Sequence, residues 1–247
     1  MEQTQTGWHR FLTPRDRAVL GATSWAKKAP FGLGDRPALL VVDDYYAGLG
    51  FPRMKILDAV REWPSACGLE GWQAIDRTVH LVAAARAARV PVVYAKSWSH
   101  NPSPWNRKIR VDASPRGDGP NPADIVAELA PHADDVVIEK STPSAFQGTS
   151  LEMLLRSWDR DTILVCGEAT SGCVRATVVD GCCAGFAIGV VAECCFDRFE
   201  ASHWVSLFDM DQKYSDVIGV ELVCRYLERI PYPNQVQPMT RPGAESK

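Results

Sequence analysis

Short, continuous apolar runs recur along the chain, and the gaps between them leave room for a helix. Each run is six to eight residues long. A run of this length and composition is typical of a strand that is buried on both faces of a sheet. The pattern predicts five strands, at residues 38–43, 91–97, 135–141, 161–167 and 187–194.

Segments with apolar residues at helical spacing separate or follow these runs. They predict helices at residues 72–89, 123–130, 149–158, 171–186, 200–211 and 213–230. Strands that alternate with helices indicate a parallel sheet covered on both faces. We therefore expect an α/β protein with a three-layer, Rossmann-like fold and a mostly parallel central sheet. Residues 1–35 are expected to form an N-terminal arm, residues 36–230 the domain, and residues 231–247 a polar, Pro-rich tail.

The composition narrows the classes of partner. The 247 residues carry a net charge of −3, which predicts no basic surface for nucleic acid or anionic lipid. No apolar run approaches the roughly 20 residues of a membrane-spanning helix, and the start, MEQTQTGWHRF, lacks an apolar leader. No G-x-G-x-x-G follows the first strand, so we expect no dinucleotide cofactor. The sequence predicts a cytoplasmic protein that binds a small molecule.

The eight cysteines show no metal-binding spacing. There is no C-x-x-C pair and no His at zinc-finger distance, so we expect reduced cysteines that pack as small apolar residues. Cys173 differs from the others because it follows the strand at 161–167, at the turn into the next predicted helix.

Three reactive side chains lie at the ends of predicted strands or in the segment that follows one. They are Asp43, Lys140 and Cys173. In an open parallel sheet the site lies beyond the carboxyl ends of the strands, so these side chains are expected to meet. A neighbouring amine and a helix N-terminus lower a thiol pKa, and an acid can move the protons. Each residue also has a structural alternative: Asp43 as a cap, Lys140 as a solvated strand end and Cys173 as core.

Two blocks around these residues resemble a known family. The stretches EKSTPSAFQGTSLE (139–152) and CGEATSGCVRATVVD (166–180) resemble the isochorismatase-like cysteine hydrolases, over roughly residues 35–230. The stretches PSACGLEGW (64–72) and DRFEASHWVSLFDMDQKYSDV (197–217) are similar to the subgroup of N-carbamoylsarcosine amidohydrolase and maleamate amidohydrolases. The resemblance implies a cysteine amidohydrolase that cleaves a small N-carbamoyl amino acid and releases ammonia through a thioester.

The resemblance also assigns roles. It implies that Cys173 is the nucleophile, Lys140 its thiolate partner and Asp43 the base. It implies a cis peptide between Glu168 and Ala169, which aims the N–H groups of Ala169 and Cys173 at the oxyanion. Glu168 departs from the pattern, since relatives carry a small or apolar residue there. It is expected either to enter a polar network or to contact a substrate amine.

Other features of the subgroup concern the substrate and assembly. The resemblance implies that Arg198 binds a substrate carboxylate, with an ion pair to Asp197 or Asp209 as the structural alternative. Phe146 and Trp98 are expected to wall the pocket unless they serve in packing. We expect no metal and no cofactor, because residues 44–60 contain no His for the metal of the nicotinamidases. A homotetramer is implied by analogy. The alternatives are a maleamate-type amidohydrolase, or a non-amidase isochorismatase-type hydrolase or binding protein.

Overall fold

The computed structural model describes residues 7–24, 29–97 and 119–230. Trp98, most of the loop predicted at 98–122 and the predicted C-terminal tail therefore lie outside the described residues. Within the described part of the chain, no helix is long and apolar enough to cross a bilayer.

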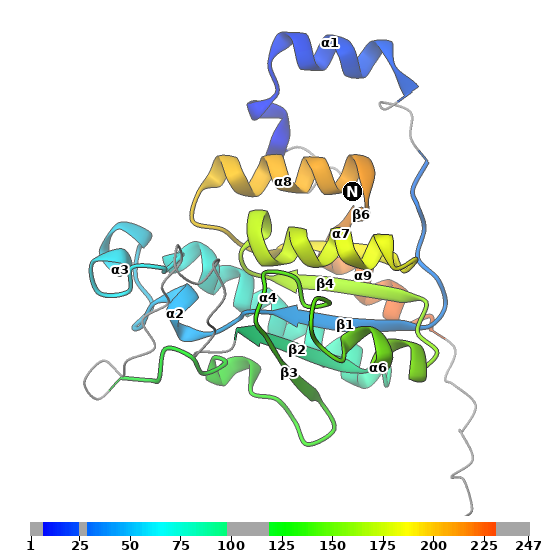
Figure 1. The fold of residues 1–247 in the computed structure, drawn as a ribbon. Helices are drawn as coiled ribbons and strands as arrows, with labels where there is room; N and C mark the ends of the chain where they lie inside the picture. The colour runs from blue at the N-terminus through cyan, green and yellow to red at the C-terminus, as the bar shows by residue number, and fades with distance from the viewer. Residues whose placement is uncertain (1–6, 25–28, 98–118, 231–247) are drawn as a thin grey trace, which may run out of the picture.

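A six-stranded sheet, parallel throughout, forms the centre of the molecule, with strand order β3-β2-β1-β4-β5-β6 (Figure 1). This confirms the predicted α/β class and its parallel sheet. The strands are β1 (Pro37–Val42), β2 (Val92–Ser97), β3 (Val136–Lys140), β4 (Thr162–Gly167), β5 (Ala187–Cys195) and β6 (Asp216–Ile218). All residues of β1 and β4 are buried, as continuous apolar runs predict.

The register of the strands places the candidate site at one edge of the sheet. Val42, the last residue of β1, pairs with Gly167 of β4, and Ser97 of β2 pairs with Lys140 of β3. The residues that follow these strands therefore emerge side by side, beyond the carboxyl ends of the strands.

Helices cover both faces of the sheet (Figure 1). The helices α4 (Gly68–Ala87) and α9 (Val220–Leu227) pack against each other and against β5. On the opposite face lie α7 (Arg175–Cys183) and α8 (Glu200–Lys213), which also contact each other. The remaining helical segments are η1 (Gly7–Phe11), α1 (Pro14–Ala22), α2 (Tyr46–Leu49), α3 (Ile56–Glu62), η3 (Ala127–Leu129), α6 (Leu151–Ser157) and η4 (Thr170–Val174).

The helix predicted at 213–230 is wrong in its first part. Residues Asp216–Ile218 form β6, which pairs with β5 and extends the sheet, and α9 begins only after Gly219. This strand holds only two apolar residues, Val217 and Ile218, and the longer helical period around it hid them.

The helix predicted at 123–130 is also wrong. The structure has only the 3-10 turn η3 there, because the backbone of this segment pairs with the residues after β1. Tyr46 N donates to Asp124 O at 3.2 Å, and Ala47 N donates to Pro122 O at 2.9 Å.

The N-terminal segment is more ordered than its weak periodicity predicts. Helix α1 begins with a capping box between Thr13 and Asp16, with Pro14 at its first position. Trp8 of η1 is buried in the core and contacts Phe208 of α8.

Candidate functional site

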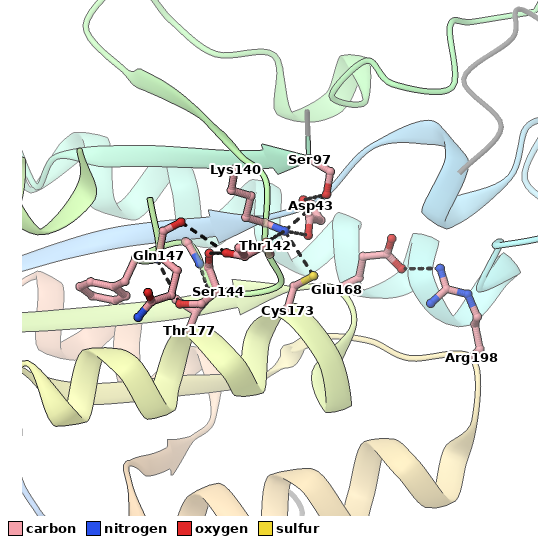
Figure 2. Close-up of polar contacts among 12 residues, drawn as sticks. Asp43, Ser97, Lys140, Thr142, Ser144, Gln147, Glu168, Cys173, Thr177 and Arg198 are labelled. Atoms are coloured by element: carbon pink, nitrogen blue, oxygen red, sulfur yellow. Dashed lines mark hydrogen bonds and ion pairs between the residues drawn. The ribbon is translucent and has the colours of Figure 1, made fainter. Parts of the chain in front are cut away.

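Asp43, Lys140 and Cys173 meet at the carboxyl edge of the sheet (Figure 2). Lys140 Nζ lies 2.6 Å from Asp43 Oδ2 and 3.2 Å from Cys173 Sγ. All three residues are buried: Asp43 is 2% exposed, Lys140 is 0% exposed and Cys173 is 8% exposed. The cluster is therefore a buried acid, amine and thiol in direct contact, and the solvated alternative for Lys140 is wrong.

Each of these side chains is positioned by the end of its strand. Asp43 adopts a left-handed backbone with φ of 57°, which turns the chain out of β1, and its N–H donates to Ala95 O of β2 at 2.8 Å. Lys140 is the last residue of β3. Cys173 lies in the turn η4 that joins β4 to α7, where the amides of Gly172 and Val174 donate to Ala169 O.

Two further residues support the cluster, and the sequence interpretation missed both. Ser97 Oγ donates to Asp43 Oδ1 at 3.4 Å and accepts from Lys140 Nζ at 3.4 Å. Thr142 contributes its backbone carbonyl, 3.4 Å from Lys140 Nζ. Ser97 ends β2, so its place at a strand end was the signal available in the sequence.

The thiol does not have the lowered pKa that the sequence predicts. Burial and the charge of Asp43 raise the pKa of Cys173 well above its usual range, although Lys140 opposes the rise. Burial alone would lower the pKa of Lys140, but its contacts with Asp43 and Cys173, led by the charge of Asp43, outweigh burial and raise the pKa. The free protein therefore holds a protonated Cys173 thiol beside the ammonium of Lys140.

This arrangement suits proton transfer followed by nucleophilic attack. Asp43 lies where it can accept the thiol proton, and Lys140 touches both the acid and the sulfur. When Cys173 becomes a thiolate, the positive charge of Lys140 stabilises it. This stabilisation is strong because the buried site contains little water to screen the charge.

The peptide between Glu168 and Ala169 is cis, as the resemblance implies. Gly167, just before it, has φ of 113°, and a Cβ there would lie 2.0 Å from Val42 O. Only glycine allows β4 to approach β1 this closely.

Glu168 forms a buried ion pair with Arg198. Its Oε2 accepts from Arg198 Nη2 at 3.2 Å and from the Cys67 thiol at 3.6 Å. The side chain of Glu168 is 4% exposed and that of Arg198 is 28% exposed. Of the two expectations for Glu168, the structure shows the polar network. Burial raises the pKa of Glu168 to about 7, although Arg198 lowers it.

The alternative partners expected for Arg198 are occupied elsewhere. Asp209 pairs with Arg175 at 3.4 Å and with Lys213 at 2.7 Å. Asp197 accepts from the amide and hydroxyl of Ser171. Arg198 contacts Asp197 only through its own backbone N–H, at 2.8 Å.

The contacts of Phe146 favour packing over a role in the pocket. Its ring lies 6.0 Å from that of Phe186, and it would touch a Cβ placed on Gly181. Gly181 is eight residues beyond Cys173, about 12 Å along a helix.

The expectation for the other cysteines holds in part. Cys67, Cys166, Cys194 and Cys195 are buried, as predicted. Cys183 is exposed, and Cys182 and Cys224 are half-buried. Within residues 7–24, 29–97 and 119–230, no three His, Cys, Asp or Glu side chains gather in a way that could hold a metal ion.

A cavity of about 830 Å³ lies beside the carboxyl end of β5, between α4, α8 and α9. Arg198 and Asp197 line it together with Glu70, Trp204 and Arg225. Asp43, Lys140 and Cys173 are not among its lining residues, so this cavity is a neighbour of the reactive cluster and does not contain it.

Comparison with known proteins places the chain in a family. A family model described as the isochorismatase domain matches residues 60–221, which include Lys140 and Cys173 but not Asp43. N-carbamoylsarcosine amidase from an Arthrobacter species is 33% identical over 224 residues, covering 86% of this chain and 79% of that protein. The chain belongs to the isochorismatase family.

Other members give a consistent result. Maleamate amidohydrolase from Pseudomonas putida is 34% identical over 199 residues, covering 78% of this chain and 87% of that protein. A cysteine hydrolase from Pseudomonas syringae superposes with a TM-score of 0.69 at 22% identity, covering 83% and 97% of the two chains. N-carbamoylsarcosine amidase from Thermoplasma acidophilum gives 0.61 at 26% identity, covering 75% and 97%. The family and subgroup resemblance predicted from the motifs is confirmed.

Proposed function

We propose that the protein is a cysteine-dependent amidohydrolase that cleaves a small N-carbamoyl amino acid, such as N-carbamoylsarcosine, and releases ammonia. The observation that carries this proposal is the contact of Lys140 with both Asp43 and Cys173, at 2.6 Å and 3.2 Å. A buried thiol beside an acid and an amine supplies the groups that nucleophilic acyl transfer requires.

The first half of the reaction uses the three residues in turn. Asp43 takes the proton of Cys173, and the sulfur attacks the carbonyl carbon of the terminal amide. The N–H groups of Ala169 and Cys173 are proposed to hold the resulting oxyanion. Asp43 then gives its proton to the leaving nitrogen, the C–N bond breaks, ammonia departs and a thioester remains on Cys173.

The second half returns the enzyme to its starting state. Water attacks the thioester carbon and loses a proton to Asp43 as the C–S bond breaks. The thiolate leaves beside Lys140 and recovers the proton from Asp43. Each cycle therefore consumes one water, and Asp43 is free to act again.

Arg198 is proposed to bind a carboxylate at the other end of the substrate. Its planar guanidinium suits a bidentate contact with a carboxylate, and its side chain is accessible from the neighbouring cavity. A maleamate-type amic acid is the alternative substrate, supported by the similarity to the Pseudomonas putida enzyme. A homotetramer in the cytoplasm remains a prediction, which light scattering and fractionation would check.

Ammonia release from a panel of N-carbamoylsarcosine, N-carbamoylglycine, maleamate, biuret and nicotinamide tests the proposal. We expect Cys173→Ala to abolish release, while Cys182→Ala, a matched change on the following helix α7, retains it. Normal release by Cys173→Ala would exclude the cysteine mechanism. A panel without any ammonia release would favour a non-amidase hydrolase or a binding protein.

A further inference from the structure

The ion pair of Glu168 and Arg198 is buried and has further contacts, unlike an isolated ion pair on the surface. Glu168 is almost completely buried, and its Oε2 receives both the guanidinium of Arg198 and the thiol of Cys67. The other oxygen lies against Gly48 of α2, where a Cβ would lie only 2.0 Å from Oε1. The glycine therefore leaves the space that the carboxyl group fills.

Glu168 immediately follows β4 and comes five residues before Cys173, and it contacts Arg198 directly. Figure 2 shows Cys173 on one side of Glu168 and Arg198 on the other, with the carboxyl group turned toward Arg198. Arg198 Nη2 contacts this carboxyl group at 3.2 Å, so a substrate carboxylate that reaches Arg198 comes close to Glu168.

Two carboxyl groups near Glu168, those of Asp43 and Asp197, raise its pKa, and the charge of Arg198 opposes them. The ionisable groups that act on it or that it acts on follow the ends of β1 and β5 or immediately precede α4. They are Asp43, Asp44, Tyr45, Cys67, Asp197 and Arg198. Arg198 is the cation of this set, and Glu168 already uses its charge. A substrate carboxylate at Arg198 would therefore bring a second anion to a guanidinium that is already paired.

We propose that Glu168 is the specificity-determining partner of Arg198: it holds the guanidinium in the free enzyme and takes up a proton when the carboxylate of an acid substrate binds there. The inference rests on the proposed function, because it assigns the acid end of the substrate to Arg198. Protonated Glu168 keeps its place against Gly48 and can donate a hydrogen bond to the incoming carboxylate. The binding of uncharged amides requires no proton uptake by Glu168.

The pH dependence follows from the burial of Glu168. Its pKa is about 7 in the free protein, and a nearby carboxylate raises it further in the complex. Below pH 7 the group is already protonated, so binding needs no proton. Above pH 7, Glu168 must take up a proton from solvent when an acid ligand binds. The dissociation constant of that ligand therefore rises about tenfold between pH 6 and pH 8.

Calorimetric binding of maleamate to the Cys173→Ala protein tests the inference without turnover. Titrations at pH 8 in buffers of different ionisation enthalpy report the number of protons taken up. We expect close to one proton for each maleamate, and none for biuret, the uncharged control. The Cys173→Ala protein that also carries Glu168→Gln should bind maleamate with no proton uptake and equally well at pH 6 and pH 8.

The outcomes separate this inference from the proposed function. Three results would overturn the inference. They are proton uptake that persists in the Glu168→Gln protein, equal maleamate affinity at pH 6 and pH 8 in the protein that keeps Glu168, and no binding of maleamate. Proton-linked binding in a protein that releases no ammonia from any amide supports it while the proposed reaction fails. If Glu168→Gln does not fold, Glu168→Ala removes the same charge and carries the same expectation.

Discussion

Replacing Asp43 with Asn should change the reactivity of Cys173 and the turnover of substrate in opposite directions. Asn keeps the shape of the side chain but removes its charge and its ability to accept a proton. The charge of Asp43 raises the pKa of Cys173, whereas that of Lys140 lowers it. In Asp43→Asn the thiolate keeps its cation and loses its neighbouring anion, so the thiol should ionise more easily.

The distances in the cluster give the size of the effect. Lys140 Nζ is 2.6 Å from Asp43 Oδ2 and 3.2 Å from Cys173 Sγ, so the oxygen and the sulfur are less than about 6 Å apart. At an effective dielectric constant of about 20, two charges at 6 Å repel by about 3 kcal/mol, or about 2 pKa units. The thiolate fraction then rises about 100-fold, and the weaker nucleophilicity of a less basic thiolate reduces the gain in alkylation rate to about tenfold.

Alkylation by iodoacetamide at pH 7.5, followed by peptide mass spectrometry, measures this rate. Trypsin releases residues 161–175, and fragmentation of that peptide separates Cys173 from Cys166. Ammonia release is measured in parallel, and we expect a loss of about 10²- to 10⁴-fold for removal of a general base.

Asp44→Asn is the matched control for this experiment. Burial raises the pKa of Asp44 well above its usual range, so the change alters little charge, and both rates should stay close to those of the unsubstituted protein. Slower alkylation in Asp43→Asn, or unchanged ammonia release, would refute the role given to Asp43.

Three other substitutions test separate parts of the site. Arg198→Ala should lower kcat/KM for acid substrates by about 10- to 150-fold, the cost of about 1.5–3 kcal/mol for a charged hydrogen bond, and affect biuret far less; equal losses would make Arg198 structural. Lys140→Met should slow alkylation of Cys173 at neutral pH and shift its pH profile upward, with only partial rescue by Lys140→Arg; an unchanged profile removes Lys140 from the site. Burial lowers the pKa of His203 to about 4, so stability should fall by about 2 kcal/mol between pH 7 and 5 as the unfolded chain takes up the proton first. Urea unfolding of His203→Asn, compared at both pH values, should lack this part of the loss, and the same loss in both proteins would contradict it.

The parts of the fold that follow from local periodicity were predictable. The runs at 38–43 and 161–167 are strands because fully buried parallel strands need continuous apolar sequence, and both match β1 and β4 to within one residue. The edge strand β6 was missed because three residues carry no detectable period. Segment 123–130 was misread because its backbone bonds to α2, a tertiary contact that no local pattern contains.

In the candidate site, too, some features could be predicted from the sequence and others could not. The topology of a parallel sheet was enough to predict that Asp43, Lys140 and Cys173 meet, because each lies at a strand's carboxyl end or in the segment after it. The direction of the thiol pKa was wrong, since it depends on burial and on the distance to Asp43, which sequence does not contain. The pairing of Glu168 with Arg198 joins residues 30 apart and depends on the turn after β4, so it was left as one of two alternatives.

The central claim is that the sulfur of Cys173 becomes covalently acylated during turnover. Acid quenching during hydrolysis of the substrate that releases ammonia fastest, followed by mass spectrometry of the peptide 161–175, tests it directly. We predict an acyl group on Cys173 that forms within the first turnover and disappears when substrate is exhausted. An acyl group on any other residue, or full ammonia release with Cys173 unmodified at every time point, would contradict the account.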